Sequence, residues 1–235
     1  MNKKLVEYLS QFVNEDRLQL LYRNLENRTR YLTVVLEDIF QAQNASAVVR
    51  SADCLGIQDI HVIENRNNFK VDREVAMGAS KWTNLKHYNK IDNNSLDAIR
   101  QLKAEGYRIV ATSPHINDVL LEDFDLSKGK AALVFGTELK GISDSIKNEA
   151  DEFLKIPMYG FTESFNISVS AAIIMHHLTM RMRNESNINW KLNSEERDVV
   201  LLHWLRKTIK QSELLEVKFN ELYGNQRECF CREVR

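Results

Sequence analysis

Short apolar segments that alternate with amphipathic segments are the feature that most constrains the fold of this chain. Each apolar segment has the length and the β-branched or aromatic residues of a buried strand. We predict strands at 32–39, 57–64, 107–112, 131–136 and 153–158. We predict helices within 2–27 and at 44–55, 94–106, 141–149, 166–183, 194–210 and 211–222. This alternation predicts an α/β fold, a mostly parallel sheet with helices on both faces.

The predicted sheet lies between two helical ends. At 235 residues the chain is long enough to bury a sizeable core in one domain with extensions. We see no linker, repeat or low-complexity segment along it. We therefore expect a helical extension at 1–30, the sheet domain at 31–185 and a second helical extension at 186–235.

The composition is that of a soluble globular protein, with 43% hydrophobic and 28% charged residues. No apolar run approaches the roughly 18 residues that a membrane span needs. Glu7, Gln11 and Asn14 interrupt the first apolar stretch, and no small-residue cleavage site follows. We therefore predict an N-terminal helix rather than a signal peptide, and we expect a cytoplasmic protein.

Neither the cysteines nor the histidines predict a disulfide or a metal site. Cys54, Cys229 and Cys231 do not make a disulfide framework. His176 and His177 are adjacent on a predicted helix, so they face different directions, and we expect no metal. The net charge is −1, but both ends carry a small excess of Lys and Arg. That excess gives weak support for RNA contact through the ends.

Glycines and polar side chains follow two of the predicted strands. Gly136 closes one strand and Glu138 comes just after it, whereas Ser164 and Asn166 stand at a helix start after another strand. Ligands of open α/β sheets collect at the carboxyl ends of the strands. Apolar side chains around the second turn are suited to enclose an adenine: Ile156, Met158 and Phe165.

The helix predicted at 44–55 carries a second pair of candidates. Arg50 lies about 200° around the helix from Val48, so it points away from the buried face. Its guanidinium fork is suited to a phosphate, although a plain surface arginine fits the same pattern. Asn44 either caps the helix or orients Arg50.

The two strand-end loops also have plain structural alternatives, namely a turn after Gly136 and an N-cap at Asn166. No Gly-Lys-Ser/Thr follows Gly136, so the loop is not a P-loop. The GxGxxG dinucleotide fingerprint is absent as well. Both absences count against ATP and NAD as ligands.

Taken together, three ordered motifs resemble the SpoU/TrmH family of RNA 2′-O-ribose methyltransferases in the SPOUT superfamily. The motifs run from Asn44 to Arg50, from Leu133 to Gly141, and from Ile156 to Ala171. The match spans about residues 28–183 and is most similar to the tRNA subgroup that methylates a D-loop guanosine. Gln43 stands where that subgroup usually has histidine, a departure that concerns the tRNA target and not the chemistry.

The resemblance implies a deep trefoil knot, in which the chain around 156–183 threads through an earlier loop. It also implies a homodimer that packs through the knotted regions. S-adenosylmethionine is the implied methyl donor, held mainly by backbone groups of the three motif loops. The residues that would line its adenosine site are Thr112, Gly136, Ile156, Met158 and Phe165.

The same resemblance assigns roles in the transfer of a methyl group to a ribose 2′-hydroxyl. Arg50 would serve as the base or position the nucleophile while it contacts a phosphate. The other implied catalytic residues orient Arg50, the ribose or the methionine end of the donor: Asn44, Glu138, Ser164 and Asn166.

Candidate phosphate contacts are Arg28, Arg181 and Arg183, followed by Lys207 and Lys210. Two other functions stay open at this point. A ribosomal-RNA methyltransferase of the same family is one, although many of those carry a separate N-terminal RNA-binding domain. A non-catalytic RNA-binding module is the other, and Asn44, Arg50, Glu138 and Asn166 argue against it.

Overall fold

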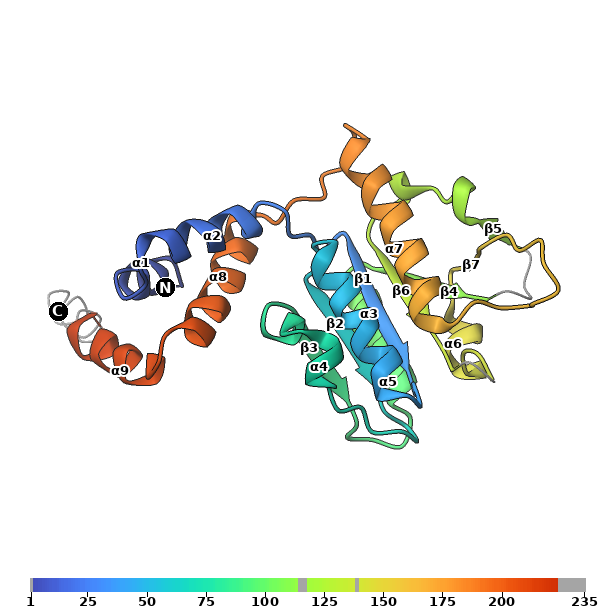
Figure 1. Cartoon of the computed structure of the whole chain (residues 1–235), viewed down its shortest axis with the longest axis horizontal. Coiled ribbons are helices and arrows are strands. Elements are labelled where there is room, and N and C mark those ends of the chain that lie inside the picture. Colours follow the sequence, from blue (N-terminus) through green and yellow to red (C-terminus); the bar gives the residue numbers. More distant parts are fainter. Residues whose placement is uncertain (1, 114–117, 138–139, 224–235) are drawn as a thin grey trace, which may run out of the picture. The chain divides into compact units, whose positions relative to one another are not determined.

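One seven-stranded sheet forms the centre of residues 28–191, and the computed structural model describes residues 2–113, 118–137 and 140–223. The strands are β1 (Leu32–Glu37), β2 (Asp59–Ile63), β3 (Asn84–Tyr88), β4 (Arg108–Thr112), β5 (Val119–Leu120), β6 (Ala131–Phe135) and β7 (Glu152–Lys155). Their order in the sheet is β3-β2-β1-β6-β4-β7-β5, and each of these pairings is parallel (Figure 1). The predicted α/β fold with a mostly parallel sheet is confirmed.

The centre of the sheet is formed by its most apolar strands. Every residue of β1 and of β6 is buried, and Val34 pairs with Leu133. Successive side chains of a strand point to opposite faces. Val34 accordingly belongs to one hydrophobic cluster and Val35 to another, so both faces of the sheet are covered.

The helices fall on the two faces as these clusters require. On one face α3 (Ala42–Cys54) and α7 (Ile167–Asn184) lie side by side (Figure 1). On the other face lie α5 (Asn94–Ala104) and α6 (Asp144–Glu149). The remaining helical turns of this part are α4 (Arg73–Ala76), η1 (Ala79–Lys81), η2 (Leu121–Asp123) and η3 (Leu126–Lys128).

Four more helices form a second compact unit from both ends of the chain. These are α1 (Asn2–Ser10), α2 (Glu15–Leu25), α8 (Ser194–Thr208) and α9 (Ser212–Tyr223). We call them the helical unit, and we call residues 28–191 the sheet unit. Within the helical unit α8 packs against α1 and α2, and the Tyr8 and Phe219 rings lie 5.3 Å apart. The predicted helical extensions at 1–30 and 186–235 stay a prediction.

Some predicted elements differ from the structure. The strands β3 and β5 were not predicted, and β7 ends at Lys155 rather than at residue 158. The expectation that Asn44 caps a helix is wrong, because α3 already begins at Ala42 and its N-cap is Gln41. Gln41 makes no side-chain cap hydrogen bond, so this start carries no capping signal.

The predicted trefoil knot stays a prediction. No helix in the described ranges has the length and apolar character needed to cross a bilayer.

Candidate functional site

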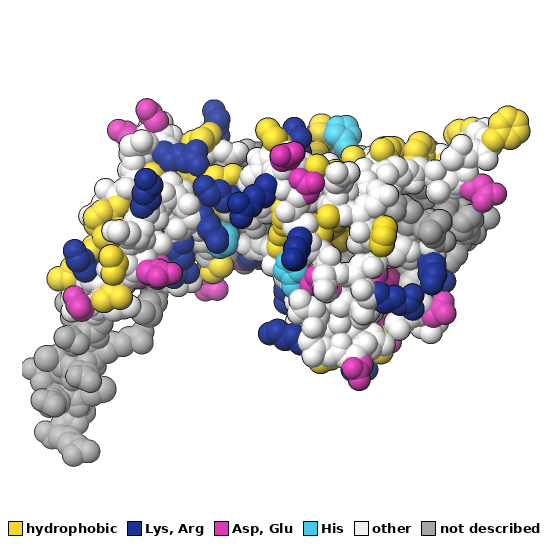
Figure 2. All heavy atoms as spheres, turned by 60° about the horizontal axis from the view of Figure 1, so that its bottom comes forward, with side chains coloured by type: hydrophobic (Ala, Val, Ile, Leu, Met, Phe, Trp, Pro, Cys, Tyr) yellow, Lys and Arg dark blue, Asp and Glu magenta, His cyan; other side chains and the backbone are white. Residues whose placement is uncertain are grey.

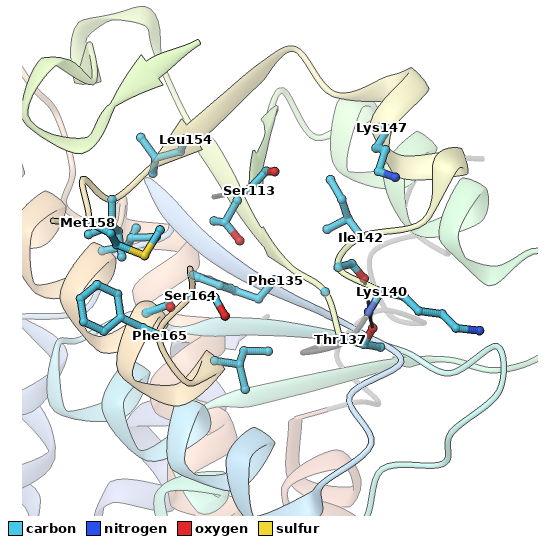
Figure 3. A pocket seen from close by; sticks show the side chains of 17 residues that line it. Ser113, Phe135, Thr137, Lys140, Ile142, Lys147, Leu154, Met158, Ser164 and Phe165 are labelled. Carbon is cyan, nitrogen blue, oxygen red and sulfur yellow. Dashed lines mark hydrogen bonds between the residues drawn. The ribbon is translucent and has the colours of Figure 1, made fainter. Parts of the chain in front are cut away.

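A cavity of about 390 Å³ opens at the carboxyl ends of β4, β6 and β7 (Figure 3). Thr112 and Phe135, the last residues of β4 and β6, and Leu154 near the end of β7 contribute to its wall. The five residues predicted to enclose the adenosine all line it: Thr112, Gly136, Ile156, Met158 and Phe165. Ser164 lines it as well. Whether these residues bind a methyl donor stays a prediction.

The turn after β6 forms one wall, and its shape depends on glycine. A Cβ on Gly136 would lie 2.3 Å from the carbonyl carbon of Gly141 and 2.4 Å from the backbone nitrogen of Ile142. Thr137 and Gly141 exchange two backbone hydrogen bonds, of 2.9 and 2.8 Å. Gly141 has a φ of 66°, a conformation that other residues rarely adopt. The turn is therefore closed so tightly that only glycine fits at 136.

The loop between β7 and α7 forms the opposite wall. Figure 3 shows Met158, Ser164 and Phe165 at one end of the cavity, while Thr137 and Lys140 lie at the other. The thioether and the phenyl ring give this end an apolar surface, and the Ser164 hydroxyl adds a polar group. An apolar wall with a few polar groups is typical of a small-molecule site.

A side-chain hydrogen bond joins the first motif to the third. Asn166 Nδ2 donates to Asn44 Oδ1 at 3.3 Å, across 122 positions of the sequence. Asn166 is also the N-cap of α7, because its Oδ1 accepts from the Ser168 backbone N–H at 2.8 Å. Asn44 Nδ2 donates to Gln41 Oε1 at 3.0 Å. The amide pair therefore connects the first turn of α3 to the start of α7.

Arg50 is exposed on α3, as its position around the helix predicted. Within the described part of the chain its guanidinium forms no ion pair, so it is accessible to an anionic ligand. Asn44, Arg50 and Asn166 are not among the residues that line the cavity. Glu138, the remaining predicted catalytic residue, lies outside the described residues.

Arg28 does not have the surface position that its predicted role needs. Its side chain is only 6% exposed and pairs with Asp53 at 2.5 Å. Asp53 lies on α3, so the pair holds the entry to β1 against this helix. A buried guanidinium in an ion pair is not available to an RNA phosphate, and we correct the prediction for Arg28 on this ground.

Arg181 and Arg183 also make contacts within the sheet unit. Arg181 donates to the carbonyl of Glu122 at 3.1 Å and to Glu185 at 3.3 Å. Arg183 donates to the Leu55 carbonyl at 3.0 Å and lies 4.5 Å above the Trp190 ring. Burial lowers the pKa of the Arg183 guanidinium. Their predicted phosphate contacts stay predictions.

Several cavity residues were not predicted from the sequence: Ser113, Lys140, Ile142, Lys147, Ser170 and Ile174. Ser113 follows Thr112 at the end of β4, so its position at a strand end is a signal that the sequence contains. Lys140 and Lys147 are exposed and place positive charge beside the cavity. In the described residues no group of three or more His, Cys, Asp or Glu side chains is arranged to hold a metal.

Residues 31–176 match the SpoU rRNA Methylase family, a range that contains all three motifs and the cavity. The chain belongs to the SpoU methylase family. The family match and the cavity thus select the same part of the sheet unit.

Individual SpoU-family relatives extend this similarity over more of the chain. The tRNA (guanosine(18)-2'-O)-methyltransferase of Borreliella burgdorferi is 43% identical over 217 residues, which cover 92% of this chain and 97% of that protein. The enzyme of the same name from Aquifex aeolicus is 32% identical over 202 residues, or 85% of this chain and 92% of that one. The crystal structure of the A. aeolicus TrmH/SpoU tRNA modifying enzyme has a TM-score of 0.73 and 28% identity. It covers 84% of this chain and 98% of its own.

Proposed function

We propose that this SpoU-family chain transfers a methyl group from S-adenosylmethionine to the 2′-hydroxyl of guanosine 18 in tRNA. The observation that carries the proposal is that the start of the first motif, in the first turn of α3, meets the loops of the second and third motifs at one end of the sheet. There a cavity of about 390 Å³ lies between the second and third motifs, and an Asn44–Asn166 hydrogen bond joins the first to the third. Relatives that match nearly the whole chain are named for this reaction.

The residues that line the cavity fit the proposed donor. Ligand sites of this kind are about 300–1,000 Å³ and mostly apolar, and this cavity lies within that range. Ile156, Met158 and Phe165 provide an apolar surface for the adenine. Thr112 and the Gly136 backbone provide polar groups for the rest of the nucleoside. When bound, S-adenosylmethionine supplies an electrophilic methyl group on a sulfonium.

The residues of the first and third motifs would act on the RNA. A ribose 2′-hydroxyl is a poor nucleophile near neutral pH, so its proton would have to pass to a base or to solvent water during the attack. Arg50 would contact a phosphate beside that ribose and hold the hydroxyl in place, since an arginine almost always keeps its own charge. Three side chains would orient the ribose and Arg50, namely those of Asn44, Asn166 and Ser164. Glu138 would support Arg50. Most of the rate enhancement would come from positioning.

RNA affinity would come mainly from cations that do not line the cavity. On the face drawn in Figure 2, Lys and Arg side chains gather over the helical unit. Lys207 on α8 and Lys210 after it are exposed, as the sequence had suggested for RNA contact. Arg181 and Arg183 remain candidates, and the buried Arg28 is left out. If phosphates are bound in this way, tRNA affinity falls steeply as the salt concentration rises.

The proposed enzyme acts as a homodimer in the cytoplasm, where tRNA is found. Tyr159 and Phe161 in the loop beside the cavity are 95% and 108% exposed. Two neighbouring aromatic side chains at full exposure favour an interface with another copy of the chain. The trefoil knot implied by the family belongs to the same proposal.

A methylation assay with purified protein and labelled S-adenosylmethionine tests the function. A tRNA transcript with guanosine 18 should accept the label, and the same tRNA with a 2′-deoxy nucleotide at 18 should not. Label on a ribosomal-RNA fragment but not on tRNA would instead support the ribosomal alternative. A protein that shifts tRNA in a gel without transferring label would be a binding module.

Arg50→Ala tests the proposed catalytic arginine. We expect it to lower the methylation rate at least ~100-fold while donor affinity stays close to that of the wild type, because Arg50 does not line the cavity. Arg100→Ala is the matched control, since Arg100 is an exposed arginine on α5, which covers the other face of the sheet. Equal turnover in the two variants would remove Arg50 from the mechanism.

A further inference from the structure

Glu37 is a buried carboxylate at the carboxyl end of β1, and the proposed mechanism does not use it. Its side chain is 2% exposed. A charge at such a site is stable only where donors surround it. Glu37 Oε1 accepts from the hydroxyls of Ser95 at 2.5 Å and Ser143 at 2.6 Å, and Oε2 accepts from the Ser143 backbone N–H at 2.7 Å. Two of the three donors therefore belong to Ser143.

Ser143 stands where the wall of the cavity meets helix α6. Gly141 and Ile142, the two residues before it, line the cavity. Ser143 is also the N-cap of α6, with its hydroxyl near the Ile146 N–H. The Thr137–Gly141 backbone hydrogen bonds close the turn itself. The Glu37 carboxylate holds Ser143, two residues after Gly141.

Ser95 connects the same carboxylate to a part of the fold away from the cavity. Asn65 Nδ2 donates to Ser95 Oγ at 2.8 Å, which directs the hydroxyl hydrogen of Ser95 toward Glu37. Ser95 lies in the first turn of α5, and it does not line the cavity. The two serines therefore make nearly equal hydrogen bonds to one oxygen, and only one of them borders the cavity wall.

We propose that Glu37 is a positioning residue for the methyl donor, acting through Ser143 on the turn that contains Gly141 and Ile142. Glu37 also directly precedes the segment that leads into α3, which carries Asn44 and Arg50. Glu37 thereby connects β1, the strand that precedes α3, to the wall of the cavity. The inference rests on the proposed function, because it assumes that the cavity binds S-adenosylmethionine.

Donor binding to the purified full-length chain, measured by titration calorimetry, tests the proposal. Ser143→Ala removes one charge-assisted hydrogen bond from the turn, and we expect about tenfold weaker donor binding. Glu37→Gln should weaken it at least as much, because an amide NH₂ cannot accept from Ser143. Ser143→Thr keeps the hydroxyl and should restore affinity to within about twofold of the wild type.

Ser95→Ala is the matched control, because it removes a hydrogen bond from the same oxygen without touching the turn. Both serine variants should lower the melting temperature, whereas only Ser143→Ala should raise the KM for the donor. The KM for tRNA should stay unchanged in both. A purely structural role would give equal donor affinities for the two variants at similar melting temperatures, and that result would overturn the proposal.

The two proposals fail in distinguishable ways. A wild-type chain that binds no S-adenosylmethionine would refute the proposed function and this inference together. A wild-type chain that methylates tRNA, with a Ser143→Ala variant that binds the donor as tightly, would refute the inference alone.

Discussion

Replacing Gly136 with alanine adds a single carbon at the point where the turn after β6 is most tightly closed. The new Cβ would lie 2.3 Å from both the carbonyl carbon and the oxygen of Gly141. All of the nearest atoms belong to the backbone, so no side-chain rotation can relieve the overlap. Raising the closest contact from 2.3 Å to 3.0 Å requires the turn to retreat by about 0.7 Å.

That displacement has two free-energy costs, and their sum gives the expected loss of stability at the turn. Overpacking of a closed site costs about 1–3 kcal/mol. The Thr137–Gly141 pair of hydrogen bonds, now 2.8 and 2.9 Å, would be stretched, at a cost of about 1 kcal/mol. We expect Gly136→Ala to lose about 2–4 kcal/mol at this turn. If donor binding requires the present shape, this is a loss of at least ~30-fold in donor affinity.

Titration of the purified variant with S-adenosylmethionine measures the effect, and urea unfolding measures the accompanying loss of stability. Gly160→Ala is the control, because its nearest neighbour would be the Thr162 nitrogen at 4.0 Å, an ordinary contact. The control should bind the donor normally. Donor affinity in Gly136→Ala within twofold of the wild type would show that the turn is not a rigid wall of the site, and the reasoning would fail.

Three further predictions follow from single contacts. Burial lowers the pKa of His61 to about 4, so the unfolded chain gains a proton first as the pH falls below about 6.5. The contribution of neutral His61 to the free energy of unfolding is therefore fully present above that pH, and it decreases by about 3 kcal/mol as the pH falls to 4. His61→Gln should remove this pH-dependent loss. Asn166→Asp keeps the acceptor that caps α7 but loses the donor to Asn44, so it should slow methylation about tenfold without lowering the melting temperature. Arg28→Met breaks the Asp53 pair and should lower the free energy of unfolding by about 2–3 kcal/mol, while the salt dependence of tRNA affinity stays the same.

Each of these has a measurement that can contradict it. Urea titrations at pH 7 and pH 4.5 should show a larger loss of stability in the wild type than in His61→Gln, and equal losses would contradict the argument. If Asn166→Asp and Asn166→Ala slow methylation but melt alike, the capping argument is lost. A flatter salt dependence in Arg28→Met would return that residue to the set of phosphate contacts.

The interior of the sheet could be predicted from the sequence, and its edges could not. β1 and β6 are buried on both faces, so their runs of valine, leucine and phenylalanine identify them. β3 lies at one edge and contains Asn84, Lys86 and His87, and it has only one fully buried residue. β5 at the other edge has two residues, too few for any periodic signal.

In the candidate site, the sequence predicted several residues that line the cavity but not the contacts that the fold creates between distant residues. The strand-end rule and the motif resemblance selected residues that line one cavity, although they are far apart in the sequence. The burial of Arg28 depends on Asp53 approaching from α3, a contact that only the fold supplies. The start of α3 was misplaced because Gln41 lacks the short polar side chain that usually marks such a position.

The helical unit takes α1 and α2 from one end of the sequence and α8 and α9 from the other. Each pair is therefore the hydrophobic covering of the other, and Trp204 and Leu205 of α8 are buried. Truncation of either pair would uncover apolar surface on the remaining one and promote aggregation. A shortened chain that loses activity would consequently say little about which end contacts the RNA.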